Sequence, residues 1–229
     1  DMVVSLMNHP RIDVNVQNRF KEQEKQKPPT MPTKVEVEEN KALRLACVGE
    51  TDYERALTTY RNDNGKPPLN AALEAKDEDA AEALLDGGDD PNEVDGDGRN
   101  ALHMAAEKGC RLPLFHRILG MIHNVNAVTT DYGWTALMYA AISNHLDMVV
   151  SLMNHPGIDM NVQGFNNLTA LHLAVINNRP AIVAQLVSDD RVDTSLKTNY
   201  KNRTPLKLAI DMGRTECVKI LREHGAPEE

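Results

Sequence analysis

At 229 residues the chain can hold one or two ordinary domains, and its 41% apolar residues are typical of a soluble protein. It contains no apolar run of about 18 residues and no signal-peptide pattern, which predicts no membrane insertion, although the start at Asp1 leaves a removed leader or a longer upstream chain open. The cysteines, Cys47, Cys110 and Cys217, are far apart and form no CxxC pair. This favours a reducing compartment, cytoplasm or nucleus, over a disulfide framework, and predicts no metal site.

The N-terminal segment 1–17 nearly repeats residues 147–163, with Arg11 in place of Gly157 and Val14 in place of Met160. It therefore looks like the second helix and exit loop of a repeat that lacks its first helix. Two explanations are open. The chain is cut or joined from a longer array of near-identical units, which is the simpler one, or the extra helix competes with 147–163 for the same groove, in the same chain or in another.

Residues 18–40 (NRFKEQEKQKPPTMPTKVEVEEN) are charged and contain proline, which is typical of a linker. Beyond them a leucine-centred segment recurs six times in register. The shared leucines of the last four copies are spaced 35, 34 and 35 apart, and the two earlier copies are weaker. The copies are KALRLACVGE (41–50), PPLNAALEAK (67–76), NALHMAAEKG (100–109), TALMYAAISN (135–144), TALHLAVINN (169–178) and TPLKLAIDMG (204–213).

These segments predict a first helix whose small residues permit close helix packing, and whose preceding Thr or Pro suits a helix start. A second apolar-periodic stretch follows in each of the last four copies, at 112–122, 146–153, 181–187 and 216–221. Turn-forming stretches such as DGDGR (95–99) then follow. One such unit cannot bury its own apolar face, so we expect the units to stack into a solenoid.

The repeated segments resemble the ankyrin repeat, whose signature centres on T-P-L-H-x-A-A with a period of about 33. The resemblance covers about 41–226 and implies an all-α solenoid of helix-turn-helix units with protruding β-turn fingers. The first copy has no finger before it, so a capping helix pair is the other interpretation there. The implied units are 41–62, 63–94, 95–129, 130–163, 164–198 and 199–226, followed by a tail at 227–229.

The net charge of -9 is unevenly distributed. Residues 74–97 hold eleven acids against Lys76, and residues 197–222 hold seven bases against two acids. The ends should therefore have opposite potentials, and the acidic run should repel nucleic acid. This run either faces a basic segment of a partner or is a solvated face that keeps an end unit soluble.

In ankyrin-like stacks the fingers and the exposed side of each first helix form a concave face that binds partners. Register with the shared leucines places one set of residues on the fingers: Gly96, Asp97 and Arg99; Asp131, Tyr132 and Trp134; Phe165, Asn166 and Leu168; Tyr200, Lys201 and Arg203. A second set falls on the first helices: Glu107 and Lys108; Ile142 and Ser143; Ile176 and Asn177; Asp211 and Met212.

Aromatic residues are scarce, yet four of the nine fall on fingers of three successive units: Tyr132, Trp134, Phe165 and Tyr200. Because aromatic side chains are common interface anchors, we expect a binding hot spot centred on Trp134 and flanked by Tyr132 and Phe165. The alternative is that the rings lie flat on neighbouring fingers and seal the stack. The basic finger residues at 200–203 are expected to be a solvated surface rather than an anion site.

Catalytic and cofactor motifs are missing from the sequence, and His103 and His172 occupy the T-P-L-H position that usually has a structural role in this family. Cys47 and Cys217 are expected to be core thiols. We therefore predict a non-enzymatic protein-interaction module, an adaptor, scaffold or inhibitor, that needs no cofactor. Two alternatives are a structural spacer or self-associating module of a larger repeat protein, and the ankyrin part of an enzyme or small-molecule sensor.

Overall fold

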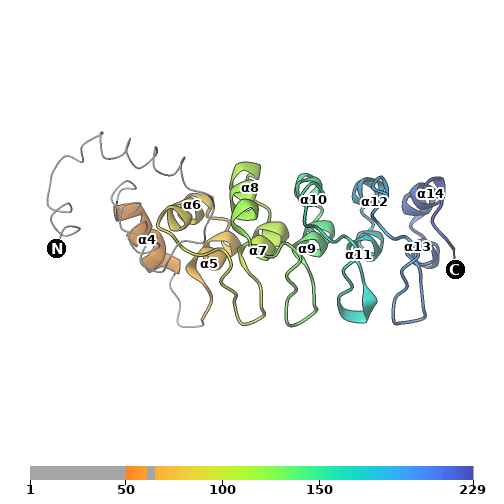
Figure 1. The fold of residues 1–229 in the computed structure, drawn as a ribbon, viewed down its shortest axis with the longest axis horizontal. Helices are drawn as coiled ribbons and strands as arrows, with labels where there is room; N and C mark the ends of the chain where they lie inside the picture. The colour runs from red at the N-terminus through yellow and green to blue at the C-terminus, as the bar shows by residue number, and fades with distance from the viewer. Residues whose placement is uncertain (1–49, 61–64, 229) are drawn as a thin grey trace.

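The computed structural model describes residues 50–60 and 65–228, which form eleven α-helices and one short 3-10 helix in an elongated stack (Figure 1). The expectations for 1–17, for 18–40, for Cys47 and for the first repeat copy at 41–50, except its last residue, lie outside these residues. None of the described helices is both long and apolar enough to cross a lipid bilayer. The all-α solenoid expected from the repeats is confirmed.

The helices form two layers, with one inner and one outer helix in each of five pairs (Figure 1). The inner helices, which lie beside the fingers, are α5 (Pro68–Glu74), α7 (Ala101–Lys108), α9 (Ala136–Ser143), α11 (Ala170–Ile176) and α13 (Pro205–Asp211). The outer helices are α6 (Glu78–Asp86), α8 (Leu112–Met121), α10 (Leu146–Met153), α12 (Pro180–Val187) and α14 (Thr215–Glu223).

Polar caps begin four of the five inner helices, whereas α5 has no side-chain cap and starts with a proline. The side chains of Asn100, Thr135, Thr169 and Thr204 each accept a hydrogen bond from a backbone N–H in the first turn. These bonds satisfy donors that a helix leaves without an intrahelical partner. At Asn100 and Thr169 the histidine three residues later bonds back to the cap, which completes a capping box.

Small side chains set the spacing of the inner layer. Ala105, Ala106, Ala140, Ala141 and Ala174 are fully buried, and α7, α9 and α11 contact one another in series. The absence of a longer side chain lets neighbouring inner helices approach closely, so each packs directly against the next. Leucine and β-branched residues of the outer helices cover the other side of this layer, and together they form one continuous core.

At the N-terminal end of the described stack, α4 (Glu50–Tyr60) packs on α5 and α6. The Tyr53 ring lies directly over Gly87, and its hydroxyl donates to Asp89 at 3.3 Å. Burial, followed by the charge of Asp89, raises the pKa of Tyr53 to about 12. The Tyr60 hydroxyl donates to Asp77 at 2.8 Å.

An asparagine ladder, formed by Asn92, Asn126 and Asn161, ties successive turns together. Each side chain donates to a backbone carbonyl in the next unit and accepts a backbone N–H from that unit. For Asn126 these bonds are 2.8 Å to the Gly157 carbonyl and 2.8 Å from the Asp159 N–H. The sequence analysis missed the ladder, whose signal is an Asp or Asn two residues before each asparagine.

Candidate functional site

Four β-turn fingers project from the inner-helix side (Figure 1). A backbone hydrogen bond closes the base of each finger, between Asp95 and Arg99, Thr129 and Trp134, Gly164 and Leu168, and Thr198 and Arg203. Left-handed residues turn the tips, among them Gly133 and the Asn166–Asn167 pair within η1 (Phe165–Asn167).

Backbone hydrogen bonds also join the tip of each finger to the next. Thr130 N donates to Asp97 O at 2.8 Å, Phe165 N to Tyr132 O at 2.7 Å, and Asn199 N to Asn166 O at 2.8 Å. The tips are therefore held in a row by the main chain rather than by their side chains. Exposed side chains at the tips are therefore not needed to join one finger to the next.

The aromatic residues of the second and third fingers form one cluster that reaches into the core. Tyr132 stacks on Trp134 with 4.8 Å between ring centroids, and Trp134 meets the buried Tyr139 edge-on at 5.4 Å. Across the finger boundary, Phe165 lies 6.5 Å from Tyr132 with the rings nearly perpendicular. Tyr139, on α9, was missed as the base of this cluster, because its helix position gives no sign that a finger ring would lie on it.

Exposure within this cluster differs from one ring to the next. Tyr132 is 49% exposed and Phe165 59%, whereas Trp134 is only partly accessible and its Nε1 is buried without a hydrogen-bond partner. Trp134 therefore supports the Tyr132 ring. For Trp134, this favours the alternative interpretation given above, in which the aromatic rings pack within the stack. The two rings of this cluster that are exposed to solvent are Tyr132 and Phe165. We therefore place the centre of the candidate site at these two residues instead of at Trp134.

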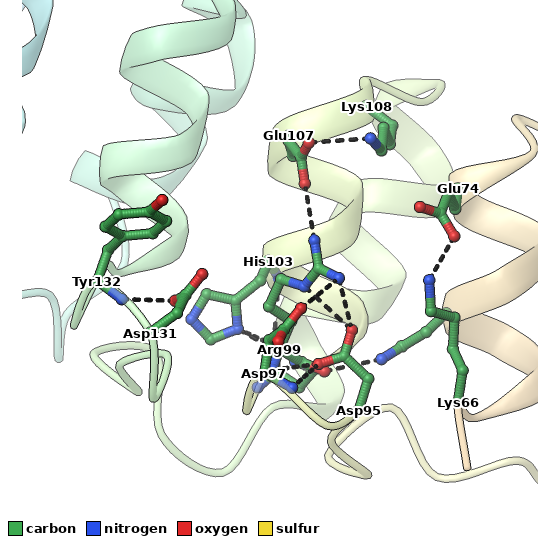
Figure 2. Close-up of polar contacts among 12 residues, drawn as sticks. Lys66, Glu74, Asp95, Asp97, Arg99, His103, Glu107, Lys108, Asp131 and Tyr132 are labelled. Carbon is green, nitrogen blue, oxygen red and sulfur yellow. Dashed lines mark hydrogen bonds and ion pairs between the residues drawn. The ribbon is translucent and has the colours of Figure 1, made fainter. Parts of the chain in front are cut away.

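Arg99 occupies the middle of a charged group on the first finger and α7, on the Asp131 side of Tyr132 (Figure 2). Its guanidinium pairs with Asp95 and Asp97 at 3.0 Å each and lies 3.6 Å from Glu107, so it links the finger to α7. Its side chain is 18% exposed. Arg99 thus has a structural task, while Asp97, whose side chain is 56% exposed, faces solvent.

Asp131 lies between Tyr132 and the charged group around Arg99 (Figure 2). It is exposed, and its Oδ1 accepts the Tyr132 N–H at 2.6 Å. Partial burial raises its pKa, but hydrogen bonds from Thr129 and from backbone N–H groups, together with the charge of Arg99, outweigh that effect and hold the pKa below its usual value. Asp131 is therefore ionised at neutral pH.

The remaining sequence-predicted residues lie along the same side. Asn166 is exposed at its tip, whereas Leu168 and Ile142 are half-buried against the core. Tyr200 is 69% exposed, with Lys201 Nζ 5.1 Å from its ring centroid. Arg203 pairs with Asp211 of α13 at 2.8 Å.

The acidic run 74–97 does not form a single face. It covers the end of α5, all of α6 and the first finger, which lie on different sides of the stack. Most of its carboxylates pair with bases: Glu74 with Lys66; Glu78, Asp79 and Glu82 with Arg111; Asp86 with Arg117; and Asp95 and Asp97 with Arg99. This arrangement favours the interpretation of a solvated, internally paired surface for the α6 part.

Two histidines and both cysteines among the described residues have structural surroundings. His103 Nε2 lies 2.9 Å from Ala127 O, and His172 Nε2 lies 3.3 Å from Arg203 O. Burial lowers the pKa of both imidazoles, so each is neutral at pH 7. Cys217 is fully buried, as expected, and burial raises the pKa of Cys110 to about 12, which leaves it as an unreactive thiol.

Comparison with known proteins gives a family model, described as ankyrin repeats (3 copies), that matches residues 71–164 and 157–228. Relatives include ankyrin repeat protein nuc-2 of Neurospora crassa, 33% identical over 65% of the chain and 14% of that protein. NF-kappa-B inhibitor alpha of Sus scrofa is 33% identical over 56% of the chain and 41% of its own length. SMC5-SMC6 complex localization factor protein 1 of Bos taurus is 36% identical over 42% and 9%. The chain thus spans less than half the length of each of these relatives.

Proposed function

The chain belongs to the ankyrin-repeat family, and we propose on this basis that it binds a partner protein through its fingers and first helices, as an adaptor, scaffold or inhibitor without catalytic activity. Ankyrin repeats are protein-interaction modules. Relatives that are named as an inhibitor and as a localisation factor support a role in restraining or positioning a partner. A reducing compartment, the cytoplasm or the nucleus, fits the unreactive thiols.

The observation that carries this proposal is the pair of exposed rings, Tyr132 and Phe165, on backbone-linked fingers. The main chain already joins these fingers, so the stack does not need two large apolar side chains in solvent. Aromatic side chains on a rigid support lose little freedom on binding and often supply most of the affinity of an interface. Their position favours a partner seated against the second and third fingers.

We expect a double variant, Tyr132→Ser with Phe165→Ser, to lose specific partners in affinity purification from cells of the source organism. Each anchor that is removed from a well-packed interface costs about 2 kcal/mol or more of binding free energy. Because Trp134 lies against the core, Trp134→Ala would lower stability as well as binding, and the serine pair is the cleaner test.

The matched control carries Glu216→Ser with Lys219→Ser on the outer helix α14, where both side chains are exposed. It should retain every partner of the unmodified chain. Thermal melting of both variants separates lost binding from lost folding. Partners that bind the two variants equally well would place the interaction surface away from the fingers and contradict the proposal.

A further inference from the structure

The exposed finger rings differ in the charge beside them. Lys201 Nζ sits 5.1 Å from the centre of the Tyr200 ring, so this ring already has a cation from its own chain. Tyr132 instead follows Asp131, whose carboxylate accepts its backbone N–H, and Phe165 contacts Tyr132 from the next finger. The Tyr132 ring thus follows a negatively charged residue, and the Phe165 ring lies next to Tyr132.

The negative charge next to these rings exceeds the positive charge that neutralises it. Arg99 is shared by Asp95, Asp97 and Glu107, and Lys108 adds a second cation by pairing with Glu107 at 2.9 Å. With Asp131 and the neighbouring Lys66–Glu74 pair, this part of the described surface holds five carboxylates and three cations (Figure 2). The Thr130–Asp97 and Phe165–Tyr132 backbone bonds keep the Asp97 carboxylate and both rings on consecutive fingers.

Resting on the function proposed above, we infer that the partner segment held by the second and third fingers is basic and apolar, and that it places an arginine or lysine over the Tyr132 and Phe165 rings beside Asp131 and Asp97. An aromatic ring face attracts a cation, and the attraction grows when both are shielded from water. The carboxylates add charge complementarity, and the apolar neighbours of the cation cover the rest of the two rings.

The charge at the other end of the finger row gives the segment a direction. Lys201 is exposed at the last finger, and Lys207 of α13 is 39% exposed. These cations repel a basic side chain, whereas the Asp97–Asp131 end attracts it. The basic residue therefore lies toward the first two fingers, and the apolar or acidic part of the segment runs toward Tyr200.

The test uses a phage-displayed library of random linear peptides, selected on the full chain. Selected peptides are synthesised, and their Kd is measured by fluorescence anisotropy at ~50 mM and ~300 mM salt, which spans strong and weak screening. We expect selected peptides to be enriched in arginine or lysine next to apolar residues, and their binding to weaken as salt rises.

Two double variants separate the contribution of the rings to binding from that of the carboxylates. Tyr132→Leu with Phe165→Leu keeps apolar side chains but removes the ring faces, and should weaken binding by about tenfold or more. Asp97→Asn with Asp131→Asn keeps the hydrogen-bond acceptors, and should weaken binding by about three- to tenfold at low salt and less at high salt. Tyr200→Ala is the control; its effect should be smaller and should leave the salt dependence unchanged.

The outcomes distinguish this inference from the function on which it rests. Selected peptides that need the rings but are neutral or acidic would overturn the cationic partner and leave the interaction surface in place. If no peptide binds in a ring-dependent way, the inference is overturned, and the affinity purification described above decides separately whether the fingers bind a protein at all. Melting curves of the leucine and asparagine variants confirm that each retains its fold.

Discussion

Gly164 lies where the second and third fingers come closest. A Cβ at this position would be 2.8 Å from Gly133 O, 2.8 Å from Trp134 Cδ1 and 2.9 Å from Tyr132 O. Two of these three neighbours are backbone atoms that are held by the finger hydrogen bonds, so they cannot move cheaply. The close approach that places Phe165 beside Tyr132 therefore depends on one residue without a side chain.

We expect Gly164→Ala to lower the free energy of unfolding by about 1–3 kcal/mol, because overpacking forces the backbone to shift. Urea denaturation followed by circular dichroism measures this change. Gly120→Ala on α8 is the matched control, since a Cβ there meets no atom within 4 Å and alanine favours a helix over glycine by about 0.5–1 kcal/mol. Equal stability of the Gly164 variant and the unmodified chain would show that the fingers are not packed this closely.

At the scale of elements, side-chain bonds across the turns connect units whose helices touch mainly through apolar groups. The asparagine ladder satisfies a backbone carbonyl and a backbone N–H of the following turn at each step. Ser195 holds the corresponding position in the last of these turns, and its hydroxyl donates to Asp193 within the same turn. The ladder thus sets the spacing between turns in addition to the spacing set by the buried alanines.

Asn126→Ala should reduce stability by about 1 kcal/mol, because two backbone groups of the next turn lose their partner. Thermal and urea unfolding give the value. Ser195→Ala, which removes a bond inside one turn, should stay within about 0.5 kcal/mol of the unmodified chain. A larger loss for Ser195 than for Asn126 would contradict the role assigned to the ladder.

Across the whole molecule, contacts between neighbouring units hold the stack together. Each helix pair contacts mainly the pairs before and after it along the chain. The stability of such a stack is a sum of unit and interface contributions, so a terminal unit can open while the others stay folded. Leu152 on α10 and Leu221 on α14 are both fully buried, the first inside the stack and the second in its last described helix pair.

Leu152→Ala and Leu221→Ala should each lower the local free energy of unfolding by about 2–5 kcal/mol. The two variants should differ in how many helices lose stability. Hydrogen exchange followed by mass spectrometry reads the effect in each helix. Leu221→Ala should speed exchange in α13 and α14 and leave α7 and α9 protected, whereas Leu152→Ala should speed exchange on both sides of α10. Exchange that rises uniformly through the whole chain in both variants would mean that the stack unfolds as a single unit.

Sequence patterns were enough to predict the repeat, both helices of the last four units and the buried small residues, because these features follow from spacing along one helix and from local capping. Sequence patterns did not predict that Trp134 supports Tyr132, that Arg99 pairs with three carboxylates, or that the acidic run is divided over several sides of the stack. Tyr132 and Trp134 share one finger, as do Arg99, Asp95 and Asp97, so these contacts form because the turn bends the chain back on itself. Glu107 meets Arg99 from α7, across the gap between finger and helix. The partners of these side chains depend on how the fingers bend and how neighbouring units meet, which spacing within one unit does not specify.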